Sequence, residues 1–199
     1  MEFHFDYHTI ASIVRTATES KTRISELVLK QQADQLERSE EDIFRQMENN
    51  YQVMTACIDP GSEKDIRSTS GLTGGSAYKM RQVSESGKSL TGSLMSSALY
   101  RALAVSELNA AMGRIVAAPT AGSCGILPAA VLTMEAEKGC SHDDCVMALF
   151  TASAVGMVIA DNACLAGAEG GCQAECGSAA AMAAPAAGGA APAAEEKTE

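Results

Sequence analysis

The sequence contains no tryptophan, and aromatic residues make up only 4% of its 199 residues. Alanine, glycine and serine are abundant instead. A β-sandwich or β-barrel needs many β-branched and aromatic residues, so this composition argues against such folds. Closely packed helices tolerate small residues well, and the length suits one domain with a sizeable core. We therefore expect an all-α fold with a single compact helical domain over residues 1–184.

Basic residues are also few, with 15 Lys and Arg against 25 Asp and Glu, and a formal net charge of −10. Neither Lys nor Arg occurs between Lys138 and Lys197. A protein that binds nucleic acid needs a basic surface to neutralise phosphates. The sequence therefore predicts no nucleic-acid partner.

Features of export and membrane insertion are missing as well. The first residues, MEFHFDYHTI, lack the cationic start and apolar core of a signal peptide. The longest apolar run, residues 146–160, is shorter than a bilayer-spanning helix. Seven cysteines in a chain without a leader favour reduced thiols over a disulfide framework. We expect a cytoplasmic protein with no membrane partner.

Hydrophobic spacing predicts several helices. Residues 9–37 have helical periodicity with a polar break at ESKT, and Ser39 followed by three acids is typical of a helix start. Ile43, Tyr51 and Met54 belong to a core-facing stripe in that helix. Further helices are expected over residues 89–113, from Ile126 onward, and over residues 145–160, which are apolar on all sides and should be buried.

Two glycine-containing loops are candidates for binding. The first holds Thr73, Gly74, Gly75 and Ser76 and leads into a helix that carries Lys79. Backbone N–H groups at a helix start can hold an anion such as a substrate carboxylate. The alternative, an ordinary turn with solvated lysines, is favoured by the residues alone.

The second loop contains Thr120, Gly122, Ser123 and Cys124, directly before a helix. Its hydroxyls and thiol converge at a helix N-terminus, where the pKa of a cysteine is lowered, so a nucleophilic Cys124 is one hypothesis. No histidine partner for it is evident. Nearby Asn109 could bind a substrate amide or carboxylate, or could cap a neighbouring turn.

The stretch DNACLAGAEGGCQAECGS, residues 161–178, carries Cys164, Cys172 and Cys176 on what we expect to be a tight glycine-shaped turn. Its C-x7-C-x3-C spacing matches neither a zinc pair nor a ferredoxin run. The alternative is that these cysteines are small packing residues. From Ala179 the composition changes to alanine, glycine and proline without periodicity, and we expect residues 185–199 to be a disordered tail.

Three motifs together closely resemble the alpha chain of the iron–sulfur-dependent bacterial L-serine dehydratases. They are SGLTGGSAYKM, LNAAMGRIVAAPTAGSCGILP and ADNACLAGAEGGCQAECGSAAAMAA, and the stretch EEDIFRQMENNYQVM also looks like that family. The resemblance covers about residues 10–184. It implies an all-helical L-serine ammonia-lyase that converts L-serine to pyruvate and ammonia without pyridoxal phosphate. A [4Fe–4S] cluster held by three cysteines leaves one iron open as a Lewis acid for the serine hydroxyl.

The resemblance carries over to specific residues only in part. Cys172, in GGCQAE, matches a cluster ligand, whereas the segment that holds the family's other two ligands is absent, and the chain resembles an alpha chain cut short at its C-terminal end. The other cysteines of the motifs, Cys124, Cys164 and Cys176, do not match ligands. We therefore expect a chain that is inactive unless another polypeptide supplies the missing cysteines.

The expected substrate-binding residues follow from the density of motifs, and no general base is identified. They are Thr73, Gly74, Gly75, Ser76, Lys79, Asn109, Thr120, Gly122 and Ser123. The expected partners are L-serine and a serine dehydratase beta chain, and a homo-oligomer is a further option. The alternative reading is a non-catalytic helical remnant that acts as an interaction module.

Overall fold

The computed structural model describes residues 8–191, and within that range it contains helices and no β-strand. This confirms the all-α fold. The α-helices are α1 (Ile10–Ser20), α2 (Ile24–Gln35), α3 (Glu40–Ala56), α4 (Ile58–Gly61), α5 (Ser76–Glu85), α6 (Gly92–Ala110), α7 (Ile126–Lys138), α8 (His142–Asn162) and α9 (Gly167–Ala190), with one short 3-10 helix, η1 (Ala121–Ser123).

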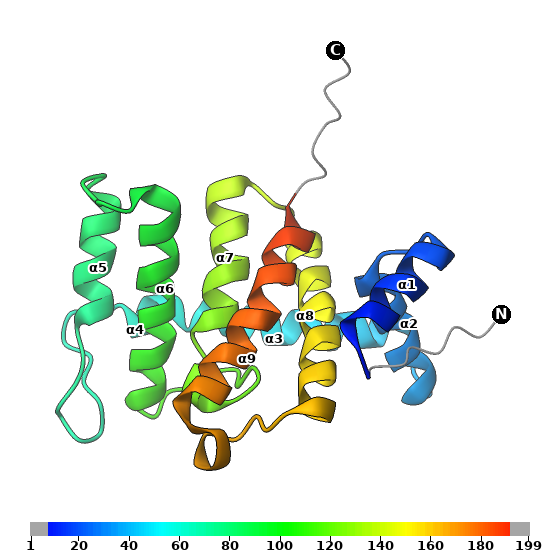
Figure 1. Cartoon of the computed structure of the whole chain (residues 1–199). Coiled ribbons are helices and arrows are strands. Elements are labelled where there is room, and N and C mark those ends of the chain that lie inside the picture. The colour runs from blue at the N-terminus through cyan, green and yellow to red at the C-terminus, as the bar shows by residue number, and fades with distance from the viewer. Residues whose placement is uncertain (1–7, 192–199) are drawn as a thin grey trace.

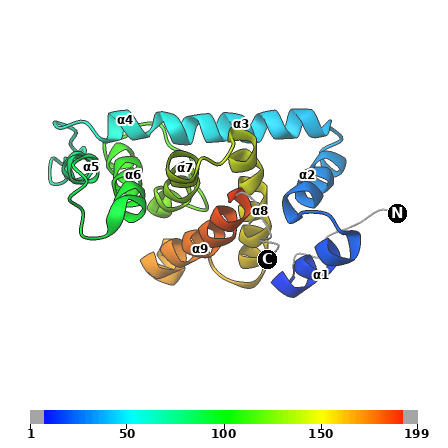
Figure 2. The same cartoon turned by 90° about the horizontal axis from the view of Figure 1, so that it is seen from above.

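The helices form three layers. Helices α5, α6, α7 and α8 stand side by side in a row, and each runs opposite to its neighbour (Figure 1). The long helix α3 lies across one face of this row, as the view from above shows (Figure 2). On the opposite face α9 packs against α7 and α8, and α1 and α2 close the far end of the row.

Local sequence explains where several helices begin and end. Ser39 and Ser141 are N-caps, and each side chain accepts a hydrogen bond of 3.1 Å from a backbone N–H of the first turn. Acidic residues follow both caps, where they interact favourably with the positive end of the helix dipole. Lys21, with a φ of 54°, ends α1, so the polar break expected in residues 9–37 divides this segment into two helices.

Helix α8 is the centre of the core, as its apolar sequence predicts. Eight of its residues are buried, and it packs against α2, α3, α7 and α9. With 21 residues it is the one described helix that is long and apolar enough to cross a membrane by length and composition alone. The helix is longer than the apolar run of residues 146–160, because Asp143, Asp144 and Asn162 extend it at the two ends.

The C-terminal part of the described chain differs most from expectation. The irregular segment between α8 and α9 is short, and Gly171, with φ 73° and ψ 178°, separates one helical turn from the long part of α9. Residues 172–178 are therefore helical rather than part of a tight turn.

The expected tail is also partly wrong, because residues 185–190 continue α9 and its Ala186 and Ala190 are buried. Small residues without periodicity can still form a packed helix where α7 and α8 offer a close surface. The part of the expected tail from residue 192 onward lies outside the described residues.

Candidate functional site

The segments singled out by sequence meet at one edge of the helical row, the lower edge in Figure 1. Because neighbouring helices run in opposite directions, the start of α5, the end of α6, the start of α7 and the start of α9 all lie there. The two glycine-containing loops and the cysteine stretch are thus brought to the same edge, although they lie up to about a hundred residues apart in sequence.

The end of α6 holds the first loop. The carboxylate of Glu107 accepts hydrogen bonds from the backbone N–H groups of Gly75 (2.9 Å) and Ser76 (2.7 Å), and Glu107 is only 9% exposed. The backbone N–H of Thr69 also donates to the carbonyl of Ala110 (3.0 Å). The backbone N–H groups at the start of α5 therefore hold an anion, but that anion is a carboxylate of the protein itself rather than of a substrate.

The same end of α6 holds the second loop. The side-chain amide of Asn109 donates a hydrogen bond to the carbonyl oxygen of Ala121 at 3.0 Å. Of the two roles considered for Asn109, capping a neighbouring turn is the one that this contact fulfils. Beside it, the hydroxyls of half-buried Thr120 and buried Ser123 lie 3.3 Å apart.

Helix α9 brings a carboxylate against this second loop. A Cβ atom placed on Gly122 would lie 2.2 Å from Oε2 of Glu175, and one on Gly167 would lie 2.7 Å from it. The carboxylate of half-buried Glu175 therefore fits between two glycine backbones, where a larger residue would displace it. Within residues 8–191 this carboxylate forms no hydrogen bond or ion pair, so it is available to a ligand.

Two of the three cysteines of the stretch 161–178 lie on the same part of α9 as Glu175. Cys172 is exposed and follows Gly171, and its sulfur lies 3.6 Å from that of half-buried Cys176. The hydrogen bond with Cys172, together with partial burial, raises the pKa of the Cys176 thiol. Exposed Cys164 contacts a different group, the carboxylate of Glu169, at 3.1 Å.

The hypothesis of a reactive Cys124 is wrong. Its side chain is 2% exposed, and burial raises the pKa of the thiol to about 11. The helix start does favour a thiolate, but loss of solvation outweighs that effect. Cys124 is a core residue next to Val105 and Cys57.

The remaining predicted binding residues belong to the first loop and to the first turns of α5. Thr73, Ser76 and Lys79 are exposed, Gly74 is half-buried and Gly75 is buried. In the described part of the chain, Lys79 makes no ion pair, and no hydrogen bond joins residues 73–79 directly to residues 120–123. In the described structure, the end of α6 is bonded to both loops, through Glu107 to the first and through Asn109 to the second.

A complete cluster site is not formed by the described residues. Between residues 8 and 191 no three His, Cys, Asp or Glu side chains gather closely enough to hold a metal ion. Among the described thiols, Cys176 alone lies within sulfur contact of Cys172, the expected ligand. The described residues alone therefore do not fit a cluster held by three thiolates.

Sequence reasoning did not select Glu107 and Glu175 as site residues. Glu107 is the only charged residue between Arg101 and Arg114, in a helix of mainly apolar and small residues. An isolated acid in such a helix is a usable signal, because an unpaired buried carboxylate is costly. Glu175 had no comparable signal, since its contact with Gly122 depends on how α9 packs.

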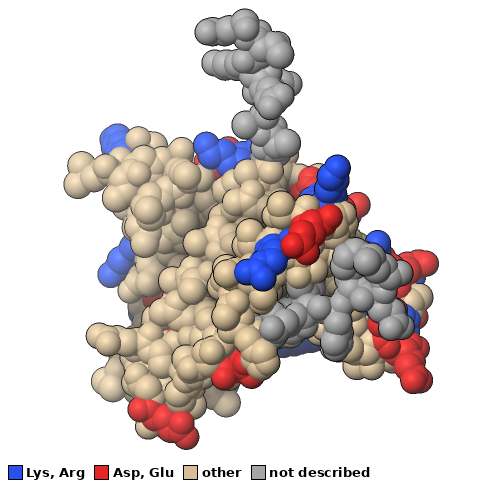
Figure 3. Space-filling view, turned by 45° about the vertical axis from the view of Figure 1, so that its right-hand side comes forward, with Lys and Arg blue, Asp and Glu red and all other residues tan. Residues whose placement is uncertain are grey.

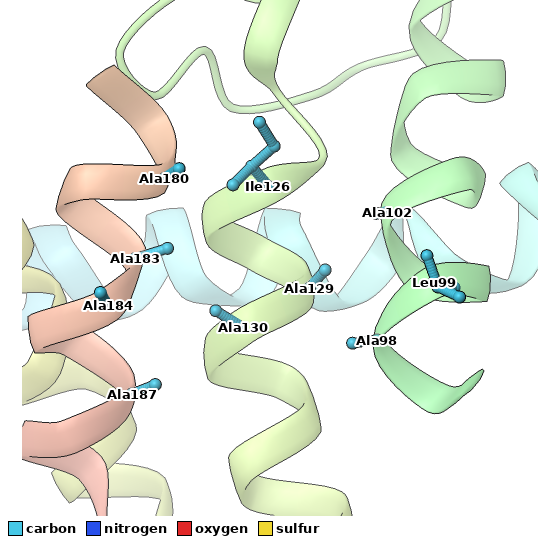
Figure 4. A pocket seen from close by; sticks show the side chains of 10 residues that line it. All are labelled: Ala98, Leu99, Ala102, Ile126, Ala129, Ala130, Ala180, Ala183, Ala184 and Ala187. Carbon is cyan, nitrogen blue, oxygen red and sulfur yellow. The ribbon is translucent and has the colours of Figure 1, made fainter. Parts of the chain in front are cut away.

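A separate apolar groove lies on the face that carries α9. It has a volume of about 420 Å³ and runs between α6, α7 and α9 (Figure 4). Its lining is apolar throughout and consists of Ala98, Leu99, Ala102, Ile126, Ala129, Ala130, Ala180, Ala183, Ala184 and Ala187. Wide areas of this side of the molecule carry no charged side chains (Figure 3).

Comparison with known proteins agrees with the motifs. Residues 19–198 match the family described as serine dehydratase alpha chain. The chain is 42% identical over 180 residues to the probable L-serine dehydratase, alpha chain, of Bacillus subtilis, covering 90% of this chain and 60% of that protein. It is 36% identical over 179 residues to the L-serine dehydratase, alpha chain, of Peptoniphilus asaccharolyticus, covering 90% and 61%.

A longer relative matches over the same share of this chain. The L-serine dehydratase of Streptomyces coelicolor is 35% identical over 187 residues, which is 90% of this chain and 40% of that protein. The chain thus spans about 60% of the length of the two alpha chains named above. On the strength of the family match and these identities, the chain belongs to the serine dehydratase alpha chain family.

Proposed function

We propose that this chain forms part of an L-serine ammonia-lyase, in which it provides the substrate-binding edge and one cluster ligand. The main support is the convergence of the Thr120–Ser123 hydroxyls, the free Glu175 carboxylate and Cys172 at one edge of the fold. L-Serine has an ammonium, a carboxylate and a hydroxyl, so a site for it needs groups of matching charge and polarity.

The proposed roles follow from the groups available. The Glu175 carboxylate binds the substrate ammonium, since it is half-buried and unpaired in the described part of the chain. The hydroxyls of Thr120 and Ser123 bind polar groups of the substrate at Gly122, where Asn109 fixes the turn. The exposed side chains of Lys79, Thr73 and Ser76 offer an ammonium group and two hydroxyls to its carboxylate, because the backbone N–H groups of Gly75 and Ser76 are already bonded to Glu107. The reaction removes the α-proton and the hydroxyl, and hydrolysis of the aminoacrylate formed gives pyruvate and ammonia.

We further propose that Cys172 is one of three thiolate ligands of a [4Fe–4S] cluster. When bound, such a cluster supplies a Lewis acid for the serine hydroxyl. Its other two ligands would come from a polypeptide segment outside residues 8–191, so the described part of the chain is inactive alone. All seven cysteines are free in the structure, which fits a reducing cytoplasm.

The proposal is tested by assaying pyruvate formation from L-serine with the chain alone and with the chain co-purified with polypeptides that supply the missing cysteines and the beta chain. We expect turnover only in the assembled complex.

Glu175→Gln should lower kcat/KM about 10- to 100-fold, because it removes one charge-assisted hydrogen bond. Exposed Glu63→Gln is the control and should leave kcat/KM unchanged. Full activity of the Glu175→Gln complex would refute the role of Glu175, and turnover by the chain alone would refute the incomplete site.

A second role, as a helical interaction module, is favoured by the apolar groove. Helix α9 packs against α7 and α8, and on the same face the apolar groove lies between α9, α7 and α6, which makes it a surface suited to one more helix (Figure 4). The two alpha-chain relatives are longer than the part matched here. The occupant we propose is therefore an apolar helix from that remaining part of the family polypeptide, and small alanines allow it to approach closely.

Sedimentation with the unmatched part of the Bacillus subtilis alpha chain tests this docking. Ala184→Glu places a charge in the exposed lining of the groove and should abolish the complex. Ala181→Glu lies on the same helix outside the lining and should not. Equal binding by both variants would refute the groove as the docking site, and self-association without the added segment would indicate a second copy instead.

A further inference from the structure

The cysteine pair at the start of the long part of α9 has a geometry that the lyase reaction does not require. The sulfur atoms of Cys172 and Cys176 lie 3.6 Å apart, in contact but not bonded. The two residues are one helical turn apart, so their side chains share one face of α9. Solvent reaches both, since Cys172 is exposed and Cys176 is half-buried.

Closing a disulfide here needs a small local change. Four residues of helix separate two Cα atoms by about 6 Å, within the range of about 4.4–6.8 Å seen in disulfides. The Cβ atoms, about 5–6 Å apart in a regular helix, must approach to about 4 Å. Cys172 lies in the first turn after Gly171, which has non-helical dihedral angles. That turn lacks the hydrogen bonds that fix the middle of a helix, so it can tighten.

The other cysteines are less suited to form a disulfide with Cys172 or Cys176. Cys57, Cys124, Cys140 and Cys145 are buried. Cys164 is exposed, but its thiol is directed to the carboxylate of Glu169 and the carbonyl of Ala166.

We propose that Cys172 and Cys176 form a reversible dithiol–disulfide couple that takes its oxidising equivalents from low-molecular-weight disulfides. The thiolate of one cysteine attacks a sulfur of the small disulfide, which releases one small thiol and leaves a mixed disulfide. The second cysteine attacks the protein sulfur of that bond and releases the second small thiol. Two protein S–H bonds and one small-molecule S–S bond are thereby replaced by one protein S–S bond and two small-molecule S–H bonds.

The consequence for activity rests on the proposed function. If Cys172 is a cluster ligand, the oxidised couple withholds it, and cluster assembly depends on the thiol redox state. The couple itself does not depend on any cluster, so the two proposals can fail separately.

Peptide mapping tests the couple directly on the full chain. The chain is equilibrated in glutathione buffers of increasing oxidised fraction, alkylated under denaturing conditions, and cleaved after glutamate. Cleavage after Glu175 places Cys172 and Cys176 on different peptides, so only a disulfide can keep residues 170–175 joined to the peptide that begins at Cys176. We expect this linked pair to be at least about ten-fold more abundant than any other linked pair in the folded chain, because the two thiols have a high effective concentration. In urea the buried cysteines become accessible, and a linked pair of Cys140 with Cys145, which are nearly as close in sequence, should appear beside it.

Two variants test which cysteines form the linked pair. Cys164→Ser should leave the linked pair unchanged, whereas Cys176→Ser should remove it and leave Cys172 as a mixed disulfide with glutathione. Full alkylation of both cysteines in the most oxidising buffer would overturn the couple, as would a link from Cys172 to Cys164. Iron uptake by reduced and by oxidised chain, in the presence of the polypeptide that supplies the other ligands, then tests the regulatory consequence separately.

Discussion

At the residue scale, the buried thiols determine how the protein responds to alkali. Burial raises the pKa of both Cys124 and Cys145 to about 11 from an ordinary value of 9.0. Above pH 9 the unfolded chain therefore loses protons that the folded chain retains, and the free energy of unfolding falls as the pH rises towards 11. Below pH 9 both states hold these protons and the stabilisation is fully present.

We expect each of the two thiols to contribute roughly 2–3 kcal/mol of this loss between pH 9 and 11. Urea unfolding at several pH values measures it, and Cys124→Ala should have a shallower decline than the wild-type chain. Exposed Cys164→Ala is the matched control and should follow the wild-type slope. A Cys124→Ala chain with an undiminished slope would contradict this assignment.

The environment of Glu107 leads to a second prediction about stability. Its nearly buried carboxylate accepts from two backbone N–H groups, and hydrogen bonds to a charged group are stronger than neutral ones. Glu107→Gln should lower the free energy of unfolding by about 2 kcal/mol. Chemical denaturation measures it, with Glu85→Gln, an exposed ion-pair partner of Arg81, as a control expected to change stability by less than about 1 kcal/mol. Equal losses in both variants would show that Glu107 is not the support of the first loop.

At the element scale, close helix packing depends on small residues. A Cβ atom on Gly61 would lie 2.1 Å from the carbonyl oxygen of Ala104, a backbone atom that cannot move aside easily. Gly61→Ala should therefore separate α4 from α6 and cost about 1–3 kcal/mol. Gly177 in α9 has nothing within 4 Å, so Gly177→Ala should be neutral or stabilise by up to about 1 kcal/mol. Thermal unfolding compares the two, and a stable Gly61→Ala variant would argue against tight α4–α6 contact.

The elements that sequence predicted best are those governed by local interactions. Ser39 was recognisable as a cap because its hydrogen-bond partner is three residues away. Helix α8 was recognisable because its own residues are apolar on all sides. The alanine-rich end of α9 was not, since its stability comes from contacts with α7 and α8 rather than from its own pattern.

In the candidate site, too, the sequence revealed the local motifs but not the long-range contacts. Its loops and cysteines were visible as motifs, but the contacts that bring them together join residues far apart in sequence. Asn109 reaches Ala121, and Glu175 reaches Gly122, only because the helices alternate in direction and α9 folds back over the row.

At the scale of the whole molecule, the described residues form a layered helical unit with an open apolar groove and with no group of side chains that could hold a metal ion by itself. Both features have the same explanation in the proposed function, because the part of the family polypeptide that this chain does not span would cover the groove and bring further cysteines to Cys172. In that proposal, the chain is one component of an enzyme whose chemistry depends on assembly.

The claim that a cluster forms only in an assembled complex is tested most directly by the iron and acid-labile sulfide content after anaerobic reconstitution. This content is measured for the chain alone and for the chain assembled with the remaining part of a longer relative. We predict no stoichiometric cluster on the chain alone and about four irons per assembled complex. Cys172→Ser should abolish this uptake, and Cys164→Ser should preserve it. A full cluster on the isolated chain, or one that survives Cys172→Ser in the complex, would contradict the account.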